Sequence, residues 1–214
     1  MAEARSHLPR HQMVWVRRGA WASVLADQNA PDADPLIQSW AEKGWPLVAR
    51  SRTCEDRDHL LALGVALPPS RGKTRHAFQC DAEHIVEFEK PPLLALAAAV
   101  APAAWLDVIS ALLLLETDTR CFGSLAWEFW TGLPYLTAES DIDLLWDVTS
   151  EAEADRLAME IARIDRLSPF RIDGEFITPS DAGIQWREWN SGESVVMAKT
   201  SEGARLLPRD RVFT

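Results

Sequence analysis

Two aspartates separated by one residue, Asp141 and Asp143, are well suited to bind a metal ion. If they lie on a β-strand, their side chains point to the same face, while Ile142 and Leu144 face the core. Carboxylate oxygens are the ligands that hard divalent cations prefer. The sequence therefore predicts a site for Mg²⁺ or Mn²⁺ on one face of a strand.

A Gly-Ser pair, Gly123-Ser124, precedes these aspartates at an expected junction between a strand and a helix. Backbone N–H groups, the hydroxyl and the positive end of the helix dipole can all contact phosphate oxygens at such a junction. Small residues allow the phosphate to approach closely. The pair and the aspartates in this order are typical of a nucleotidyltransferase site that holds a metal-bound triphosphate.

A third carboxylate usually completes such a site, and the segment 170–177 offers two candidates. Arg171, Asp173 and Glu175 share one face if this segment is a strand. Asp173 is the first choice and Glu175 the second. The alternative for either is an ordinary solvated strand residue.

Basic residues that could bind phosphates occur at Arg71, Lys73 and Arg75, and at Lys199 after an apolar run. Gly72-Lys73-Thr74 is not a P-loop, because Leu67 stands where that motif requires glycine. The three residues could bind the phosphates of a long anionic substrate, or they could form a basic strand edge. Lys199 could contact a phosphate or extend to solvent.

The elements that must position the aspartates are predicted from hydrophobic periodicity. A helix from about Glu151 to Leu167 would bury Leu157, Ile161 and Ile164, with Thr149 or Ser150 as its N-cap. A late strand covers residues 192–199, and the basic tail with Arg205, Arg209 and Arg211 is expected to be less ordered. The other predicted elements are the strand Arg120–Phe122, the helix Ser124–Trp130, the loop Thr131–Ser140, and the strands Asp141–Trp146 and Phe170–Ile177.

The N-terminal part has the pattern of a smaller α+β module. The apolar stretch Pro91–Leu115 is interrupted by Pro102 and contains Asp107, which favours two buried helices over a membrane span. We therefore predict two domains, residues 1–92 and 93–214. Within the first we expect the strands Met13–Val16 and Pro46–Arg50, the helix Gly19–Gln28, the loop Asn29–Pro35 and a strand-like stretch from Arg71 to Cys80.

Composition excludes several classes of protein. The chain has 214 residues, 47% of them hydrophobic, and a net charge of −10. Residues 116–214 carry 10 Lys/Arg against 19 Asp/Glu, which disfavours nucleic acid as the main ligand.

Residues 1–7 show no signal-peptide or lipidation pattern, so a cytoplasmic protein is expected. Cys54, Cys80 and Cys121 have no metal-binding spacing and are expected to be reduced, packed thiols.

Several motifs together resemble a known family, the malonate decarboxylase holo-acyl-carrier-protein synthases, also called phosphoribosyl-dephospho-CoA transferases. The resemblance extends from about residue 10 to about residue 207. It implies a polymerase-β-like nucleotidyltransferase fold behind the N-terminal module. The motifs are Arg10-His-Gln-Met-Val-Trp15, Gly72-Lys-Thr-Arg75, Phe122-Gly-Ser-Leu-Ala-Trp127, Thr131-Gly-Leu-Pro-Tyr-Leu136, Ser140-Asp-Ile-Asp-Leu-Leu-Trp146, Arg171-Ile-Asp-Gly-Glu175 and Trp186-Arg-Glu-Trp189.

One departure from the wider superfamily is the interval of sixteen residues between Ser124 and Asp141, which is longer than usual. The loop Thr131–Ser140 must absorb the excess.

The reaction that this resemblance implies uses 2′-(5″-triphosphoribosyl)-3′-dephospho-CoA and the apo acyl carrier subunit of malonate decarboxylase. A carrier serine attacks the phosphorus nearest the ribose, and pyrophosphate leaves. Asp141, Asp143 and Asp173, with Glu175 as the alternative, would bind two divalent ions, and Asp173 would accept the serine proton. Gly123 and Ser124 would hold the triphosphate, and Arg71, Lys73 and Arg75 the dephospho-CoA moiety.

An acyl carrier protein is usually acidic, so an enzyme of net charge −10 must present a local basic patch to it. Arg163, Arg166 and Arg187 are the candidates for this patch.

Three alternatives remain open at this level. The chain could be a nucleotidyltransferase that uses ATP or CTP on another protein or small molecule. It could instead be a catalytically silent module that binds CoA or a carrier. The carrier could also be that of citrate lyase.

Overall fold

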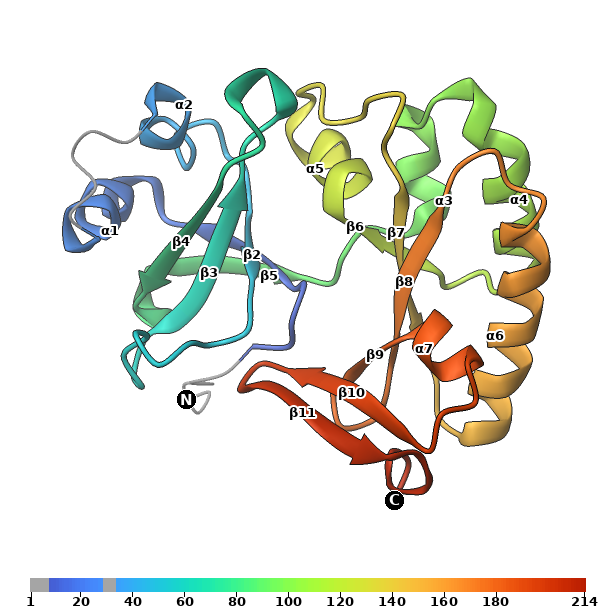
Figure 1. Cartoon of the computed structure of the whole chain (residues 1–214). Helices are drawn as coiled ribbons and strands as arrows, with labels where there is room; N and C mark the ends of the chain where they lie inside the picture. The colour runs from blue at the N-terminus through green and yellow to red at the C-terminus, as the bar shows by residue number, and fades with distance from the viewer. Residues whose placement is uncertain (1–7, 29–33) are drawn as a thin grey trace. The chain divides into compact units, whose positions relative to one another are not determined.

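The structure, a computed structural model, describes residues 8–28 and 34–214 (Figure 1). The chain divides into two units. The first consists of the described residues up to Lys90 together with Ser201–Gly203, and the second of Pro91–Thr200 and Ala204–Thr214. The N-terminal residues 1–7 and most of the predicted loop Asn29–Pro35 lie outside the described residues.

The first unit is built on a five-stranded antiparallel sheet with the strand order β4-β3-β2-β1-β5. Two buried tryptophans, Trp21 and Trp40, anchor its core, and the indole N–H of each donates to a backbone carbonyl. The strands are β1 (Met13–Val16), β2 (Leu47–Ala49), β3 (Leu61–Ala66), β4 (Arg75–Cys80) and β5 (Ile85–Glu89). The helices are α1 (Trp21–Asp27), α2 (Pro35–Gln38) and the 3-10 turns η1 (Arg18–Ala20), η2 (Pro69–Arg71) and η3 (Ala82–His84).

The predicted strand from Arg71 begins only at Arg75. Residues 69–71 form the turn η2, and Gly72 and Lys73 then adopt left-handed backbone angles, with φ of 81° and 53°. Such angles are incompatible with a strand. The sequence motif Gly72-Lys73-Thr74 is therefore a turn that leads into β4.

The second unit contains a six-stranded mixed sheet with the order β11-β10-β9-β8-β7-β6. Its strands β7 and β8 are parallel and are connected by helix α6, whereas β6 and β9 pair antiparallel with them. The strands are β6 (Arg120–Phe122), β7 (Ile142–Asp147), β8 (Ile172–Ile177), β9 (Gly183–Gln185), β10 (Val195–Thr200) and β11 (Gly203–Pro208). The helices are α3 (Leu94–Ala97), α4 (Leu106–Leu115), α5 (Gly123–Thr131), α6 (Glu151–Asp165), α7 (Trp186–Asn190), and the 3-10 turns η4 (Ala98–Val100), η5 (Ala103–Trp105) and η6 (Arg209–Arg211).

Helices α4 and α6 lie along one face of this sheet (Figure 1). Leu157 and Ile161 of α6 are fully buried, as predicted, and pack in one core with Leu144 and Trp146 of β7, whereas Ile164 near the end of the helix is only partly buried. The hydroxyl of Ser150 accepts the N–H of Glu153 at 3.3 Å, so Ser150 is the N-cap. The helix therefore covers one face of β7 and β8 and leaves the other face for chemistry.

The two helices predicted for Pro91–Leu115 are present on either side of Pro102, as α3 with η4 and as η5 with α4, but they are only partly buried. α4 buries Ile109 and Leu112 and leaves Leu114 90% exposed. Four consecutive leucines, 112–115, cannot all face one side of a helix with 3.6 residues per turn. The prediction that the basic tail is less ordered is wrong, because the tail forms β11 and the turn η6.

The tail is fixed by Arg209. Its guanidinium lies over the ring of Trp189, 3.8 Å from the ring centroid, donates to the Trp189 carbonyl at 2.6 Å, and pairs with Glu151 and Asp155. These contacts attach the C-terminal end of the second unit to α6 and α7.

The described residues form a mixed α+β structure with two sheets, in agreement with the predicted fold class. None of its helices, across residues 8–28 and 34–214, is long and apolar enough to cross a membrane. Cys80 and Cys121 are buried thiols as predicted, but Cys54 is exposed.

Candidate active site

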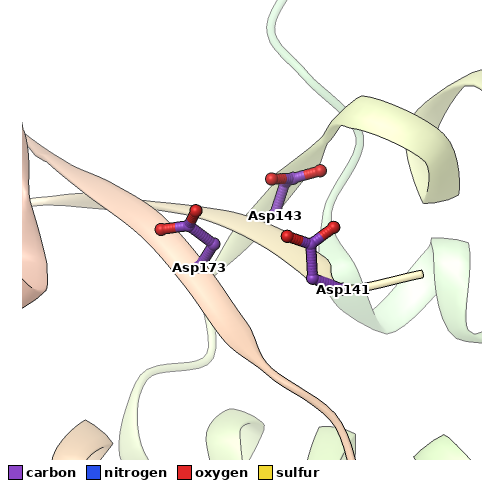
Figure 2. A group of neighbouring side chains, drawn as sticks. All are labelled: Asp141, Asp143 and Asp173. Atoms are coloured by element: carbon purple, nitrogen blue, oxygen red, sulfur yellow. The ribbon is translucent and has the colours of Figure 1, made fainter. Parts of the chain in front are cut away.

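Three aspartates come together at the N-terminal ends of the parallel strands β7 and β8. Asp141 immediately precedes β7, Asp143 is the second residue of β7, and Asp173 on β8 is the register partner of Asp143. Each offers a carboxylate oxygen that lies within 4.8 Å of the others. Figure 2 shows the three carboxylates on the same side of the two strands. Parallel pairing of adjacent strands thus places side by side residues that α6 separates in the sequence.

The alternation along β7 explains why the aspartates share a face. Ile142 and Leu144 are fully buried against the helices, while Asp141 and Asp143 are half-buried on the opposite face. Three carboxylates this close repel one another unless a cation is bound. The oxygen ligands and their spacing fit a divalent cation.

Asp173 is held by a residue that the sequence did not indicate, Gln185 at the end of β9. The Gln185 amide donates to Asp173 Oδ1 at 2.8 Å, and the N–H of Gly174 donates to the same oxygen at 2.9 Å. The Gln185 carbonyl meanwhile accepts the N–H of Glu188 and caps α7. Because Gln185 uses both ends of its amide, it fixes the orientation of the Asp173 carboxylate.

Gly123 is the first residue of α5, directly after β6, and lies against Asp143. Its φ is +63°, and a Cβ built there would be 2.0 Å from Asp143 Oδ2. Glycine is therefore required at this position both for its backbone angle and for the space that Asp143 occupies. The N-terminus of α5, with Ser124 in its first turn, opens beside the aspartates, where an anion would be stabilised.

The loop between α5 and β7 is tied down by Glu128. Its Oε2 accepts the N–H groups of Tyr135 and Leu136, each at 2.9 Å, and the ring of Tyr135 stacks on Trp127. Ser140 Oγ accepts the N–H of Thr137 at 2.9 Å. These contacts show how residues 131–140 absorb the long interval between Ser124 and Asp141.

Models of two protein-family domains match the chain. A family model described as the phosphoribosyl-dephospho-CoA transferase MdcG C-terminal domain matches residues 93–210, and the model of the corresponding N-terminal domain matches residues 9–91. The chain belongs to the phosphoribosyl-dephospho-CoA transferase family. It is accordingly a transferase, and the resemblance read from its motifs is confirmed.

Relatives of this family from several bacteria align over nearly the whole chain. A phosphoribosyl-dephospho-CoA transferase of Bradyrhizobium diazoefficiens is 37% identical over 96% of this chain and 92% of its own length. One from Xanthomonas campestris is 34% identical over 95% of this chain and 96% of its own. One from Klebsiella pneumoniae is 28% identical over 94% and 95%. No solved structure matches the chain.

Glu175 is the second choice for the third carboxylate. It does not belong to the group formed by Asp141, Asp143 and Asp173. It is 4% exposed, and its Oε1 accepts from Lys199 Nζ at 3.0 Å. The structure thus brings Asp173 to the aspartates of β7 and pairs Glu175 with Lys199.

The basic residues Arg71, Lys73 and Arg75 belong to the first unit and are exposed, whereas the aspartates belong to the second. Arg71 Nη1 lies 3.5 Å from Asp34 Oδ2, Lys73 is in the turn after η2, and Arg75 begins β4, an edge strand of its sheet. The three residues therefore lie in one turn and at the start of the edge strand that follows it.

Proposed function

We propose that this enzyme transfers the 2′-(5″-phosphoribosyl)-3′-dephospho-CoA group from its triphosphate precursor to a serine of the apo acyl carrier subunit of malonate decarboxylase. One observation carries the proposal. In a chain of the phosphoribosyl-dephospho-CoA transferase family, three aspartates converge beside the N-terminus of α5. Such a site suits the transfer of a phosphoryl-linked group from a triphosphate.

Asp141, Asp143 and Asp173 would hold Mg²⁺, with Mn²⁺ as the alternative, because hard oxygen ligands suit both ions. When bound as a pair, such ions activate the attacking oxygen and neutralise charge on the departing pyrophosphate. Gln185 would keep Asp173 in the orientation required. Glu175 is assigned to the ion pair with Lys199.

The triphosphate would lie against Gly123 and Ser124, where N–H groups at the start of α5 and the Ser124 hydroxyl can donate to its oxygens. Lys199 would also contact phosphate, since an ammonium has three donors and Glu175 accepts from one of them.

In the chemical step, the carrier serine oxygen bonds to the phosphorus nearest the ribose, and the bond from that phosphorus to pyrophosphate breaks. The serine proton passes to a carboxylate, which we assign to Asp173. The product is a phosphodiester that joins the carrier to the ribose, together with free pyrophosphate. The role of the protein is mainly to position the reactants and to balance charge.

The division of labour that we propose follows the two units. Residues 93–214 would be the catalytic domain, with a polymerase-β-like nucleotidyltransferase fold. Residues 1–92 would be the substrate-binding module, in which Arg71, Lys73 and Arg75 contact the dephospho-CoA moiety.

The proposal is tested by intact mass spectrometry of the apo carrier subunit after incubation with the protein, triphosphoribosyl-dephospho-CoA and Mg²⁺. We expect an adduct of phosphoribosyl-dephospho-CoA that requires the metal. The double variant Asp141→Asn/Asp143→Asn should form it at least about 100-fold more slowly. Asp147→Asn, an exposed position at the end of the same strand, is the matched control and should retain activity.

Two results would contradict the proposal. One is adduct formation that the double variant leaves unchanged. The other is the absence of any adduct with a competent carrier and cofactor, together with transfer from ATP or CTP in a parallel panel. The apo carrier of citrate lyase, run alongside, distinguishes the two possible acceptors.

A further inference from the structure

Three arginines line one cleft in the second unit, on the surface between α6 and α7. Arg163 and Arg166 come from the end of α6, and Arg187 comes from α7. The cleft has a volume of about 450 Å³, and Met159, Asp165 and Trp186 contribute to its walls. We propose that this cleft is the docking surface for an acidic face of the carrier protein, an inference that rests on the proposed function.

The side chains that line the cleft carry a net positive charge even when their ion pairs are taken into account. Arg187 donates to both oxygens of Asp165, at 2.8 and 2.7 Å, and is thereby neutralised. Arg163 pairs with Glu160 at 2.7 Å, but this pair is exposed and contributes little. Arg166 is exposed and, among the described residues, has no carboxylate within ion-pair distance. The surface therefore offers Arg166 and the weakly paired Arg163 to an acidic partner.

This excess is local. The residues from 116 onward carry 10 Lys/Arg against 19 Asp/Glu, so most of the surface of the second unit repels an acidic protein. A cationic cleft on such a surface would orient the partner, because like charges elsewhere disfavour other modes of approach.

Apolar groups beside the arginines favour a protein over a free small anion. Met159 is 48% exposed within the cleft, and Leu167, just after α6, is 88% exposed. The Arg187 guanidinium lies over the ring of the buried Trp186, 4.3 Å from its centroid. Exposed apolar side chains beside arginines are typical of protein interfaces.

The cleft is connected directly to the strand that carries Asp173. Arg187 donates to the carbonyl of Ile172 at 2.9 Å, and Asp165 accepts the N–H of the same residue at 3.0 Å. Ile172 immediately precedes Asp173 on β8. The cleft thus adjoins the N-terminal end of β8, next to Asp173, but on the face of the sheet that α6 covers. A carrier bound there would have to extend its serine around this end of the strand to reach the aspartates on the other face.

The test measures binding of fluorescently labelled apo carrier subunit by anisotropy, without the triphosphate substrate, so that docking is separated from chemistry. The test variant is Arg163→Glu/Arg166→Glu, which changes two exposed side chains and leaves the Arg187–Asp165 pair intact. Arg156→Glu is the matched control, because Arg156 is also exposed on α6 but does not line the cleft.

We expect the double variant to weaken carrier binding by about tenfold or more and Arg156→Glu to change it by less than about twofold. Added salt should weaken binding of the wild type more than binding of the double variant. Unchanged affinity in the double variant, or equal losses in both variants, would overturn the docking proposal. So would a wild-type protein that does not bind the carrier.

Adduct formation by the same proteins, followed by mass spectrometry, reports separately on the proposed function. Normal transfer by all variants would leave the function standing and reject the docking surface. Variant-sensitive binding without transfer by the wild type would support the surface and reject the reaction.

Discussion

Position 123 requires glycine, because a side chain there would occupy the space that Asp143 fills. Both its positive φ and the short approach to Asp143 Oδ2 exclude a side chain. Gly132, at the other end of α5, offers a matched comparison, since its φ is +68° but nothing lies within 4 Å of a Cβ built there.

We expect Gly132→Ala to lower the free energy of unfolding by about 1 kcal/mol through backbone strain alone. Gly123→Ala should cost more and should also displace Asp143, reducing the affinity for Mn²⁺ by about tenfold or more. Calorimetric titration with Mn²⁺, with urea unfolding of each variant, checks both effects. Equal Mn²⁺ affinities in the two variants would show that Gly123 has no bearing on the aspartates.

Which residues of the site could be read from the sequence depends on how far apart they are along the chain. Asp141 and Asp143 follow from the period of a single strand, and Gly123-Ser124 from one strand-to-helix junction. Asp173 could be ranked only against Glu175, because the register between β7 and β8 decides which of them reaches the pair. Gln185 could not be found, since its contact with Asp173 depends on how β9 pairs with β8.

Among the elements, the segment between β2 and β3 carries an ion pair whose strength depends on pH. Arg50, just after β2, donates to both oxygens of Asp56, at 2.7 and 2.6 Å. This side-chain hydrogen bonding, opposed by burial and helped by the Thr53 N–H, lowers the pKa of Asp56 from 3.8 to about 2. The carboxyl is 3% exposed, so solvent screens the pair weakly.

Because the folded pKa of Asp56 lies below its unfolded value, the pair stabilises the fold above about pH 4, and this contribution is lost as the pH falls toward 2. The difference in unfolding free energy between wild type and Asp56→Asn should therefore shrink by about 2 kcal/mol between pH 5 and pH 2. Urea unfolding at several pH values measures it. A difference that stays constant over this range would exclude the linkage.

Helices and strands could be predicted where a segment buries only one of its faces. They could not be predicted where both faces are buried or where both are exposed. β1, β6, β7 and α6 alternate or repeat with a clear period, and their predicted bounds are close to those observed. β3 escaped prediction because five consecutive residues, Leu61–Val65, are buried and show no alternation. The order of the C-terminal tail could not be predicted, because it depends on tertiary contacts of Arg209 with Trp189 and α6 that the sequence of the tail does not reveal.

For the molecule as a whole, the three cysteines report on the two units separately. Cys80 lies in the first unit and Cys121 in the second, and burial raises the pKa of each thiol to about 12. Cys54 is exposed. Since the thiolate is the reactive form, only Cys54 should react readily in the folded protein.

We expect iodoacetamide at pH 8 to modify Cys54 alone, and Cys80 and Cys121 to become modified at the urea concentrations at which their own units unfold. Peptide mass spectrometry of each cysteine across a urea series gives two unfolding curves from one experiment. Rapid modification of Cys121 without urea would contradict the burial of this thiol on β6.

The parallel pairing of β7 with β8 also determines when the enzyme can acquire its site during synthesis. A nascent chain that has been made as far as the end of α6 contains Asp141 and Asp143 but not Asp173. Gln185 follows later still, with β9. Translation of most of the second unit must therefore precede assembly of the three-carboxylate site, which a ribosome-bound intermediate that ends before Asp173 cannot form.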